Sequence, residues 1–239
     1  NDGTVQNTKH QTDDSRTLAH NVIPTIYKDR SGILWIGTNG YGVDKLNPYT
    51  SRFNYTTQTK NKLRSYSIRS IFEDIYGKIW ISGYFGLDRY DPQTGNFRNY
   101  YNTKSQVLPY ACDNLVYSYA NDKQEPYRYL YMGTEGTGVN RFDFKTNTFK
   151  KIFPKKSDVV ESGNRIITSI IDDGDGYLWF GSYQGLIKFN KITGTFRIYR
   201  NIPSNQSTIG PEMVTYLYED SKKNLWVGTN LGGLSLMDK

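Results

Sequence analysis

The sequence predicts an all-β protein assembled from five copies of one four-stranded antiparallel sheet. Composition gives the first indication, because the 239 residues include 21 Tyr beside 22 Gly, a mixture that favours strands joined by tight turns. Hydrophobic residues make up 36% and charged residues 22%, which excludes general disorder. No apolar run approaches the roughly 18 residues that a membrane helix needs, and no segment has a helical period.

The spacing of the tryptophans defines the repeat. Trp35, Trp80, Trp179 and Trp226 are separated by 45, 99 and 47 residues, and Tyr131 divides the double gap. The five anchors are then spaced 45, 51, 48 and 47 residues apart. An Asp precedes each Trp by six residues, and a Gly follows every anchor by six or seven. A period of this length indicates a repeat architecture in which each copy is one supersecondary unit.

Each repeat contains four short strands. The first strand is apolar on both faces, as in Ile68–Phe72 and Ile167–Ile171, which is typical of a sheet covered on both sides. The second strand carries the anchor, the third follows the Gly, and the fourth begins at a phenylalanine such as Phe97. Turns rich in Gly and Asp, such as Arg30–Gly32, join the strands as hairpins. Four strands in roughly 40–50 residues predict the blade of a β-propeller.

The repeats divide the whole chain. They cover approximately residues 22–57, 67–101, 115–153, 166–200 and 213–239, in a single propeller domain or a fragment of one. Residues 4–9 have the register of a fourth strand, since Val5 precedes Asp29 by 24 residues, as Phe149 precedes Asp173. We expect this segment to complete a preceding or closing blade, because closure removes an open edge. A five-bladed ring and part of a seven-bladed ring both fit this arrangement.

The repeated residues are interpreted as scaffold. Because the Trp and Gly-Thr positions recur in the blades, we expect them to pack blade against blade. The acidic run Asp172–Gly176 has carboxylates spaced closely enough for calcium, but it coincides with the turn between the first two strands. His10 and His20 both lie near the N-terminus, and none of the tyrosines stands out as a nucleophile. The sequence therefore predicts no catalytic residue, no metal and no cofactor.

The net charge of +7 is a mild excess of basic residues. The densest basic run passes through the expected fourth strand of the third repeat, at Lys145, Lys150, Lys151, Lys155 and Lys156. Lysines on an edge strand deter strand pairing, and this run lacks a nucleic-acid-binding motif, so we expect no contact with nucleic acid.

The candidate binding site is the face where two kinds of loop meet. In a propeller, the loops from fourth to first strand and from second to third strand lie at one end of the blades. Positions that vary between repeats at these loop tips are free for recognition. Aromatic faces stack on sugar rings, and amide, carboxylate and guanidinium groups bond hydroxyls or carboxylates. The candidate ligand-binding residues are Asn39, Tyr41, Arg64, Tyr66, Tyr84, Phe85, Tyr110, Glu135, Arg165, Tyr183, Gln184 and Asn230.

The repeat resembles the two-component regulator propeller repeat, whose pattern is V-x-x-I-x-x-D-x-x-G-x-L-W-I-G-T. The pattern is found at Ile23–Thr38, Ile68–Gly83, Ile167–Ser182 and Val214–Thr229, and the third repeat departs from it at Tyr131. The resemblance implies the extracytoplasmic sensor of a hybrid two-component regulator, in which a seven-bladed propeller precedes a membrane helix and a histidine kinase. It also implies that the chain is a fragment of such a receptor or a divergent short sensor.

The resemblance, together with the loop-tip residues, implies a non-catalytic, periplasmic, ligand-sensing segment of a signal-transduction regulator, with an oligosaccharide as its expected ligand. The positive charge is compatible with an acidic oligosaccharide. The resemblance also leads us to expect a homodimer formed through the parent receptor, and contact with the membrane only through parts of the parent outside this sequence. Two alternatives stay open. One is a propeller glycosidase or polysaccharide lyase, and the other is a structural propeller whose loops mediate protein contacts.

Overall fold

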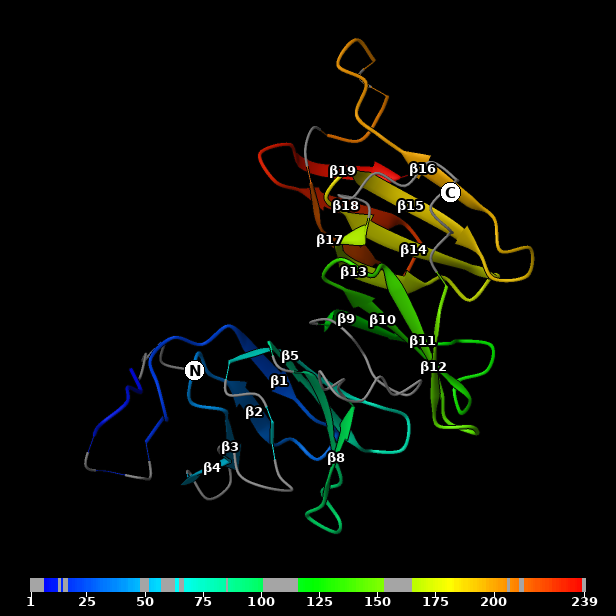
Figure 1. Ribbon diagram of the computed structural model, residues 1–239. Helices are drawn as coiled ribbons and strands as arrows, with labels where there is room; N and C mark the ends of the chain where they lie inside the picture. The colour runs from blue at the N-terminus through cyan, green and yellow to red at the C-terminus, as the bar shows by residue number, and fades with distance from the viewer. Residues whose placement is uncertain are drawn as a thin grey trace. The chain divides into compact units, whose positions relative to one another are not determined.

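The computed structural model describes residues 7–12, 14, 17–47, 52–56, 63–64, 67–84, 86–100, 116–152, 165–205, 207–210 and 213–237. Within these residues the fold is the predicted all-β one, with four antiparallel sheets of four strands and one of three (Figure 1). The same residues contain no helix long and apolar enough to span a membrane. The chain divides into two compact units, residues 1–100 and 101–239, which are described separately.

The first unit contains two sheets. One consists of β1 (Thr25–Lys28), β2 (Leu34–Gly37), β3 (Val43–Asn47) and β4 (Arg52–Thr56), and the other of β5 (Ile68–Glu73), β6 (Ile79–Gly83), β7 (Gly86–Tyr90) and β8 (Phe97–Tyr100). Every strand pairs with its neighbours in the chain, so each sheet is an antiparallel meander.

The second unit contains three sheets. The first is β9 (Val116–Asn121), β10 (Tyr129–Thr134), β11 (Val139–Asp143) and β12 (Thr148–Lys151). The second is β13 (Ile167–Asp172), β14 (Tyr177–Ser182), β15 (Gly185–Asn190) and β16 (Phe196–Tyr199). The third is β17 (Val214–Glu219), β18 (Leu225–Thr229) and β19 (Gly233–Met237). The first strands β9, β13 and β17 contact one another in that order, so the three sheets pack side by side.

Three kinds of connection recur in every repeat and are named here. The AB turn joins the first and second strands, the BC tip joins the second and third strands, and the DA loop leads from one sheet to the next. The expected fourth strand at residues 4–9 is not among the assigned strands, because residues 1–6 lie outside the described part and residues 7–10 are not in a strand. Ring closure and blade number stay predictions.

Neighbouring sheets bury each other's apolar faces. Between β13–β16 and β17–β19 the buried cluster contains Trp179, Leu186, Ile209, Val214, Leu217, Leu225 and Val227. An equivalent cluster around Trp35 joins the two sheets of the first unit, and another around Tyr131 joins β9–β12 to β13–β16. Burial of each such side chain contributes about 1.5–3 kcal/mol. At these three interfaces the anchor residues pack sheet against sheet, as their recurrence predicts.

The glycine two residues after the anchor permits this close approach. A Cβ atom on Gly37 would lie 2.7 Å from Ile68 Cγ2, and one on Gly181 would lie 2.8 Å from Val214 Cγ1. Both partners are β-branched residues at the start of the next sheet's first strand. Gly133 meets Ile167 in the same way at 2.6 Å. Real Cβ contacts are not this short, so a larger residue would force the sheets apart.

Candidate functional site

The BC tips and the DA loops meet at one end of the sheets in each unit. In the first unit Asn39 forms a β-bridge with Ser67, whose Oγ donates to Asn39 Oδ1 at 2.7 Å. In the second unit Glu135 forms a bridge with Ile166, and the Gly138 amide donates to the Arg165 carbonyl at 2.9 Å. The two kinds of loop therefore brace each other.

Three predicted site residues are exposed tyrosines at BC tips. Tyr41, Tyr84 and Tyr183 have 52%, 56% and 43% of their surface exposed. Tyr41 stacks on His20 with ring centroids 4.8 Å apart, and Tyr84 lies under Arg69, which also donates to the phenol oxygen at 2.7 Å. Each of these two rings is held by a neighbour while one part stays open to solvent. Such an oriented aromatic surface suits stacking on the apolar face of a ring.

The other predicted residues have mixed roles. Asn39 uses its side-chain oxygen, and Arg165 its backbone carbonyl, to hold the loops together. The backbone N–H of Arg64 donates to Asp88 Oδ2 at 2.8 Å. Gln184 has a buried side-chain oxygen with no hydrogen-bond partner among the described residues, and Asn230 is exposed at its tip. Tyr66, Phe85 and Tyr110 lie outside the described residues.

The repeated Asp of the AB turn binds the anchor side chain, a contact that the sequence analysis missed. The Trp35 indole N–H donates to Asp29 Oδ2 at 2.8 Å, and the Trp179 indole N–H donates to Asp173 Oδ2 at 3.2 Å. Its Oδ1 accepts two backbone N–H groups of the same turn, as Asp29 does from Ser31 and Ile33. The sequence did contain an indication of this contact. The Asp always precedes the Trp by six residues, and this spacing brings the carboxylate within hydrogen-bonding distance of the indole.

The third repeat keeps this contact with different residues. The Tyr131 hydroxyl donates to Asp122 Oδ2 at 2.9 Å, and the AB turn is three residues longer. Burial raises the pKa of the Tyr131 phenol, and the adjacent Asp122 carboxylate raises it further. Burial also raises the pKa of Asp122, but hydrogen bonds from Glu125, Tyr131 and other donors outweigh that effect and leave it below its usual value. A neutral phenol and an ionised carboxylate therefore form a charge-assisted hydrogen bond.

The acidic run at residues 172–176 consists of the last residue of β13 and the AB turn that follows it. Asp173 Oδ1 accepts the Asp175 and Tyr177 backbone N–H groups at 2.8 and 3.1 Å. Asp172 Oδ2 accepts Lys191 Nζ at 2.7 Å. These oxygens are engaged by donors of the protein itself. Among the described residues there is no group of three or more His, Cys, Asp or Glu placed to hold a metal ion.

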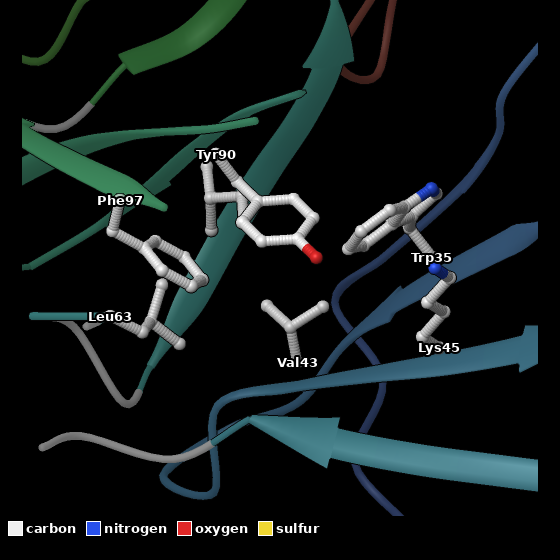
Figure 2. Close-up of a pocket in the computed structure, with 7 residues that line it drawn as sticks. Trp35, Val43, Lys45, Leu63, Tyr90 and Phe97 are labelled. Atoms are coloured by element: carbon white, nitrogen blue, oxygen red, sulfur yellow. The ribbon is translucent and has the colours of Figure 1, made fainter. Parts of the chain in front are cut away.

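Several cavities lie against the sheets among the described residues. One of about 230 Å³ lies between the sheets of the first unit, and Figure 2 shows Tyr90 between Phe97 and Trp35 in its lining. The Trp35 and Tyr90 rings meet edge to face at 5.5 Å, so this cavity is part of the packing between sheets. Another, of about 500 Å³, is a groove along the first strands β9, β13 and β17. The sequence analysis did not anticipate this groove.

The fold is thus a propeller-type array of sheets, four with four strands and one with three among the described residues, whose constant residues build the scaffold. Four segments, residues 17–40, 62–85, 161–184 and 208–231, match the family model described as two component regulator propeller. These four segments are similar to two-component regulator propeller repeats, which confirms the resemblance found in the sequence; the third repeat, anchored at Tyr131, lies outside the matched segments.

Similar proteins extend this comparison. Histidine kinase P4 of Formosa agariphila is 27% identical over 180 residues, which cover 72% of this chain and 12% of the kinase. The extracellular domain of the hybrid two component system BT4673 from B. thetaiotaomicron has a TM-score of 0.75 at 21% identity, covering 97% of this chain and 29% of that one. For the corresponding domain of BT3049 the TM-score is 0.65 at 20% identity, covering 96% and 35%. The chain spans a minor part of each relative, and the structural likenesses show the fold.

Proposed function

We propose that this chain is the ligand-sensing, extracytoplasmic propeller segment of a two-component regulator, and that it recognises an oligosaccharide. The repeat family supports the regulator assignment. The relatives support the location, because they are a histidine kinase and the extracellular domains of hybrid two component systems. Signalling would follow from a ligand that binds one arrangement of the sensor more tightly than another. In this proposal the segment binds its ligand without turning it over.

The observation that carries the proposal is the exposure of tyrosines at the BC tips. Tyr84 and Tyr183 present their rings at the end of sheets whose preceding DA loops are braced by hydrogen bonds to the BC tip of the neighbouring sheet. A rigid frame with exposed aromatic tips loses little conformational freedom on binding. Stacked aromatic pairs contribute about 0.5–1.5 kcal/mol, and we take the same range for a tyrosine on the apolar face of a sugar ring.

Calorimetry with a panel of purified oligosaccharides tests this proposal. The panel contains neutral hexasaccharides (cellohexaose, laminarihexaose, xylohexaose) and an acidic one, hexagalacturonate. Tyr84→Ala and Tyr183→Ala should each weaken binding by about 2- to 12-fold, the range that one stacking contact provides. Tyr76→Ala and Tyr127→Ala are matched controls, because both tyrosines are exposed and lie in AB turns at the opposite end of their sheets.

The outcomes separate the candidate functions. Absence of binding to every member of the panel by the folded wild-type chain would overturn the proposal. Release of shorter sugars during the same incubations would instead favour the glycosidase or lyase alternative.

A further inference from the structure

The sheet β13–β16 has a described neighbour on each side. It packs against β9–β12 through the cluster around Tyr131 and against β17–β19 through the cluster around Trp179, all within the second unit. Its BC tip consists of Tyr183 and Gln184, and Tyr183 is 43% exposed. This ring is therefore open to solvent while both neighbouring sheets are in place.

The DA segment that leads into β13 runs between two BC tips. On one edge Ile166 forms a β-bridge with Glu135, and two amides of the same tip donate to the Arg165 carbonyl at 2.9 and 3.0 Å. On the other edge Ile167 pairs with Ser182, the residue before the fourth repeat's tip. Because neighbouring strands lie about 4.8 Å apart, the two tips are held roughly 10 Å from each other. Two linked sugar rings span such a separation.

The BC tips alternate between two forms along the chain. The first and third repeats have long tips, residues 38–42 and 135–138, and each tip forms a bridge to the DA segment of the next sheet. In the second and fourth repeats only two residues separate the strands, and the exposed Tyr84 and Tyr183 lie there. The described residue Met213, at the equivalent position before β17, forms no such bridge. A long tip and the following short tip therefore make a pair.

The polar side chains of the pair formed by the third and fourth repeats lack partners among the described residues. Glu135 is exposed and Arg165 is half-buried, and neither belongs to the ion pairs of this unit in the described part of the chain. Gln184 has a buried Oε1 that accepts no hydrogen bond from a described residue. Buried acceptors of this kind are usually satisfied by water or a ligand. One carboxylate, one guanidinium and one amide thus offer donors and acceptors with no net charge.

We propose that these two tips form one subsite for a neutral oligosaccharide. Tyr183 stacks on one sugar ring, Glu135 accepts hydroxyl groups of the adjacent ring, and Arg165 donates to a sugar oxygen. Neutral sugars suit this set because each hydroxyl both donates and accepts, whereas the carboxylate of a uronic acid would be repelled by Glu135. The inference rests on the proposed function and deepens it, since it names the class of sugar and joins two repeats in one subsite.

Calorimetry with cellohexaose, laminarihexaose, xylohexaose and hexagalacturonate tests the subsite. The wild-type chain should bind a neutral sugar more tightly than hexagalacturonate. Glu135→Gln removes a charge at nearly constant size and should weaken that binding about tenfold or more, as the loss of a hydrogen bond to a charged group does. Arg165→Gln should act similarly, because its scaffold contacts use the backbone carbonyl. Glu125→Gln, an exposed carboxylate in the AB turn of the same repeat, is the matched control and should bind like the wild type.

The outcomes separate this inference from the broader proposal. If Tyr183→Ala weakens binding while Glu135→Gln and Arg165→Gln bind like the wild type, the two-repeat subsite is rejected and the BC-tip proposal stands. If hexagalacturonate binds more tightly than every neutral sugar, and Glu135→Gln strengthens it further, the neutral class is rejected. If the wild type binds none of the four, both proposals fail. An unchanged unfolding midpoint in each variant shows that a loss of affinity is not a folding defect.

Discussion

The indole Nε1 of Trp80 donates a 2.8 Å hydrogen bond to Oδ2 of Asp74, and both residues are fully buried. The same carboxylate oxygen lies 2.6 Å from the Arg89 guanidinium, while the other oxygen accepts the Tyr76 and Lys78 backbone N–H groups. One carboxylate therefore closes the AB turn, fixes the anchor ring and neutralises a cation. Because the motif is repeated, the same hydrogen bond from anchor to carboxylate stabilises the AB turn of every sheet.

Removing this carboxylate should be severe. Asp74→Ala leaves the Trp80 N–H and the Arg89 cation without their buried partner, and we expect a loss of about 3–5 kcal/mol in the free energy of unfolding. Urea denaturation followed by tryptophan fluorescence measures the change. Asp175→Ala is a suitable control, because Asp175 lies in the AB turn of the fourth repeat but does not bind its anchor. Equal losses in the two variants would contradict the assigned role of Asp74.

Lys223 occupies a position where glycine is preferred. It has φ 67°, and the corresponding residues of three other AB turns are Gly32, Gly77 and Gly176, with φ of 87°, 72° and 95°. We expect Lys223→Gly to stabilise the chain by about 0.5–1 kcal/mol, because glycine adopts this conformation without a steric cost. The gain is measured against Lys223→Ala, which also removes the lysine contacts with Asp173 and Glu219 but keeps a Cβ. A Gly variant no more stable than the Ala variant would exclude backbone strain at this site.

The contact between sheets predicts that an alanine substitution lowers the stability at one glycine and leaves it unchanged at an equivalent one. Gly181→Ala places a Cβ 2.8 Å from Val214 Cγ1, and overpacking of this kind should cost about 1–3 kcal/mol. A Cβ atom on Gly228 would have no neighbour closer than 3.6 Å, which is ordinary van der Waals contact. Gly228→Ala should therefore change stability by less than about 0.5 kcal/mol. Thermal unfolding of both variants makes the comparison. Similar losses at both positions would show that the glycines serve a purpose other than close approach.

The pKa of Asp220 should depend on Asn224. The Asn224 side chain donates to Asp220 Oδ2 at 2.8 Å, and this bond, with the Trp226 N–H, holds the pKa of Asp220 at about 2 rather than 3.8. Because the folded-state pKa is the lower one, ionised Asp220 favours folding above pH about 4, and that contribution is lost as the pH falls to about 2. Asn224→Ala should raise the pKa toward 3.8, as measured by NMR titration of the carboxyl carbon.

Asp91 is the internal reference for that titration. Its pKa of about 2 is set by Lys78 and by groups of its own turn, so it should not move in the Asn224→Ala variant. If the pKa of Asp220 also stays near 2, its turn amides and Trp226 are sufficient to hold it there.

The sequence predicts the scaffold well because the scaffold is what the repeats share. Trp35 and Trp179 recur at a constant distance from an Asp and a Gly, and each lies in a cluster between sheets. The bond from the anchor to its Asp is foreseeable in principle, since the offset of six residues is constant and the exception at Tyr131 coincides with an enlarged turn. Spacing alone does not reveal that a hydrogen bond is the reason for it.

The binding residues are harder to predict because exposure depends on packing that a repeat does not encode. Tyr84 and Tyr183 are variable tip residues and are exposed, whereas the side chain of the equally variable Asn39 bonds Ser67.

Every AB turn is closed by a carboxylate belonging to the same copy, and each of the three close glycine contacts links adjacent copies through a single type of junction. A gene segment of about 45–51 codons that encodes one copy therefore encodes the carboxylate that closes its own AB turn. Where the copy has the glycine, the segment also encodes the residues through which it contacts the copies on either side. In-frame duplication or deletion of a copy that carries the glycine would preserve this type of joint, whereas the second copy has Ser82 at that position. Proteins of this kind can consequently change the number of their copies in evolution without redesigning any one of them.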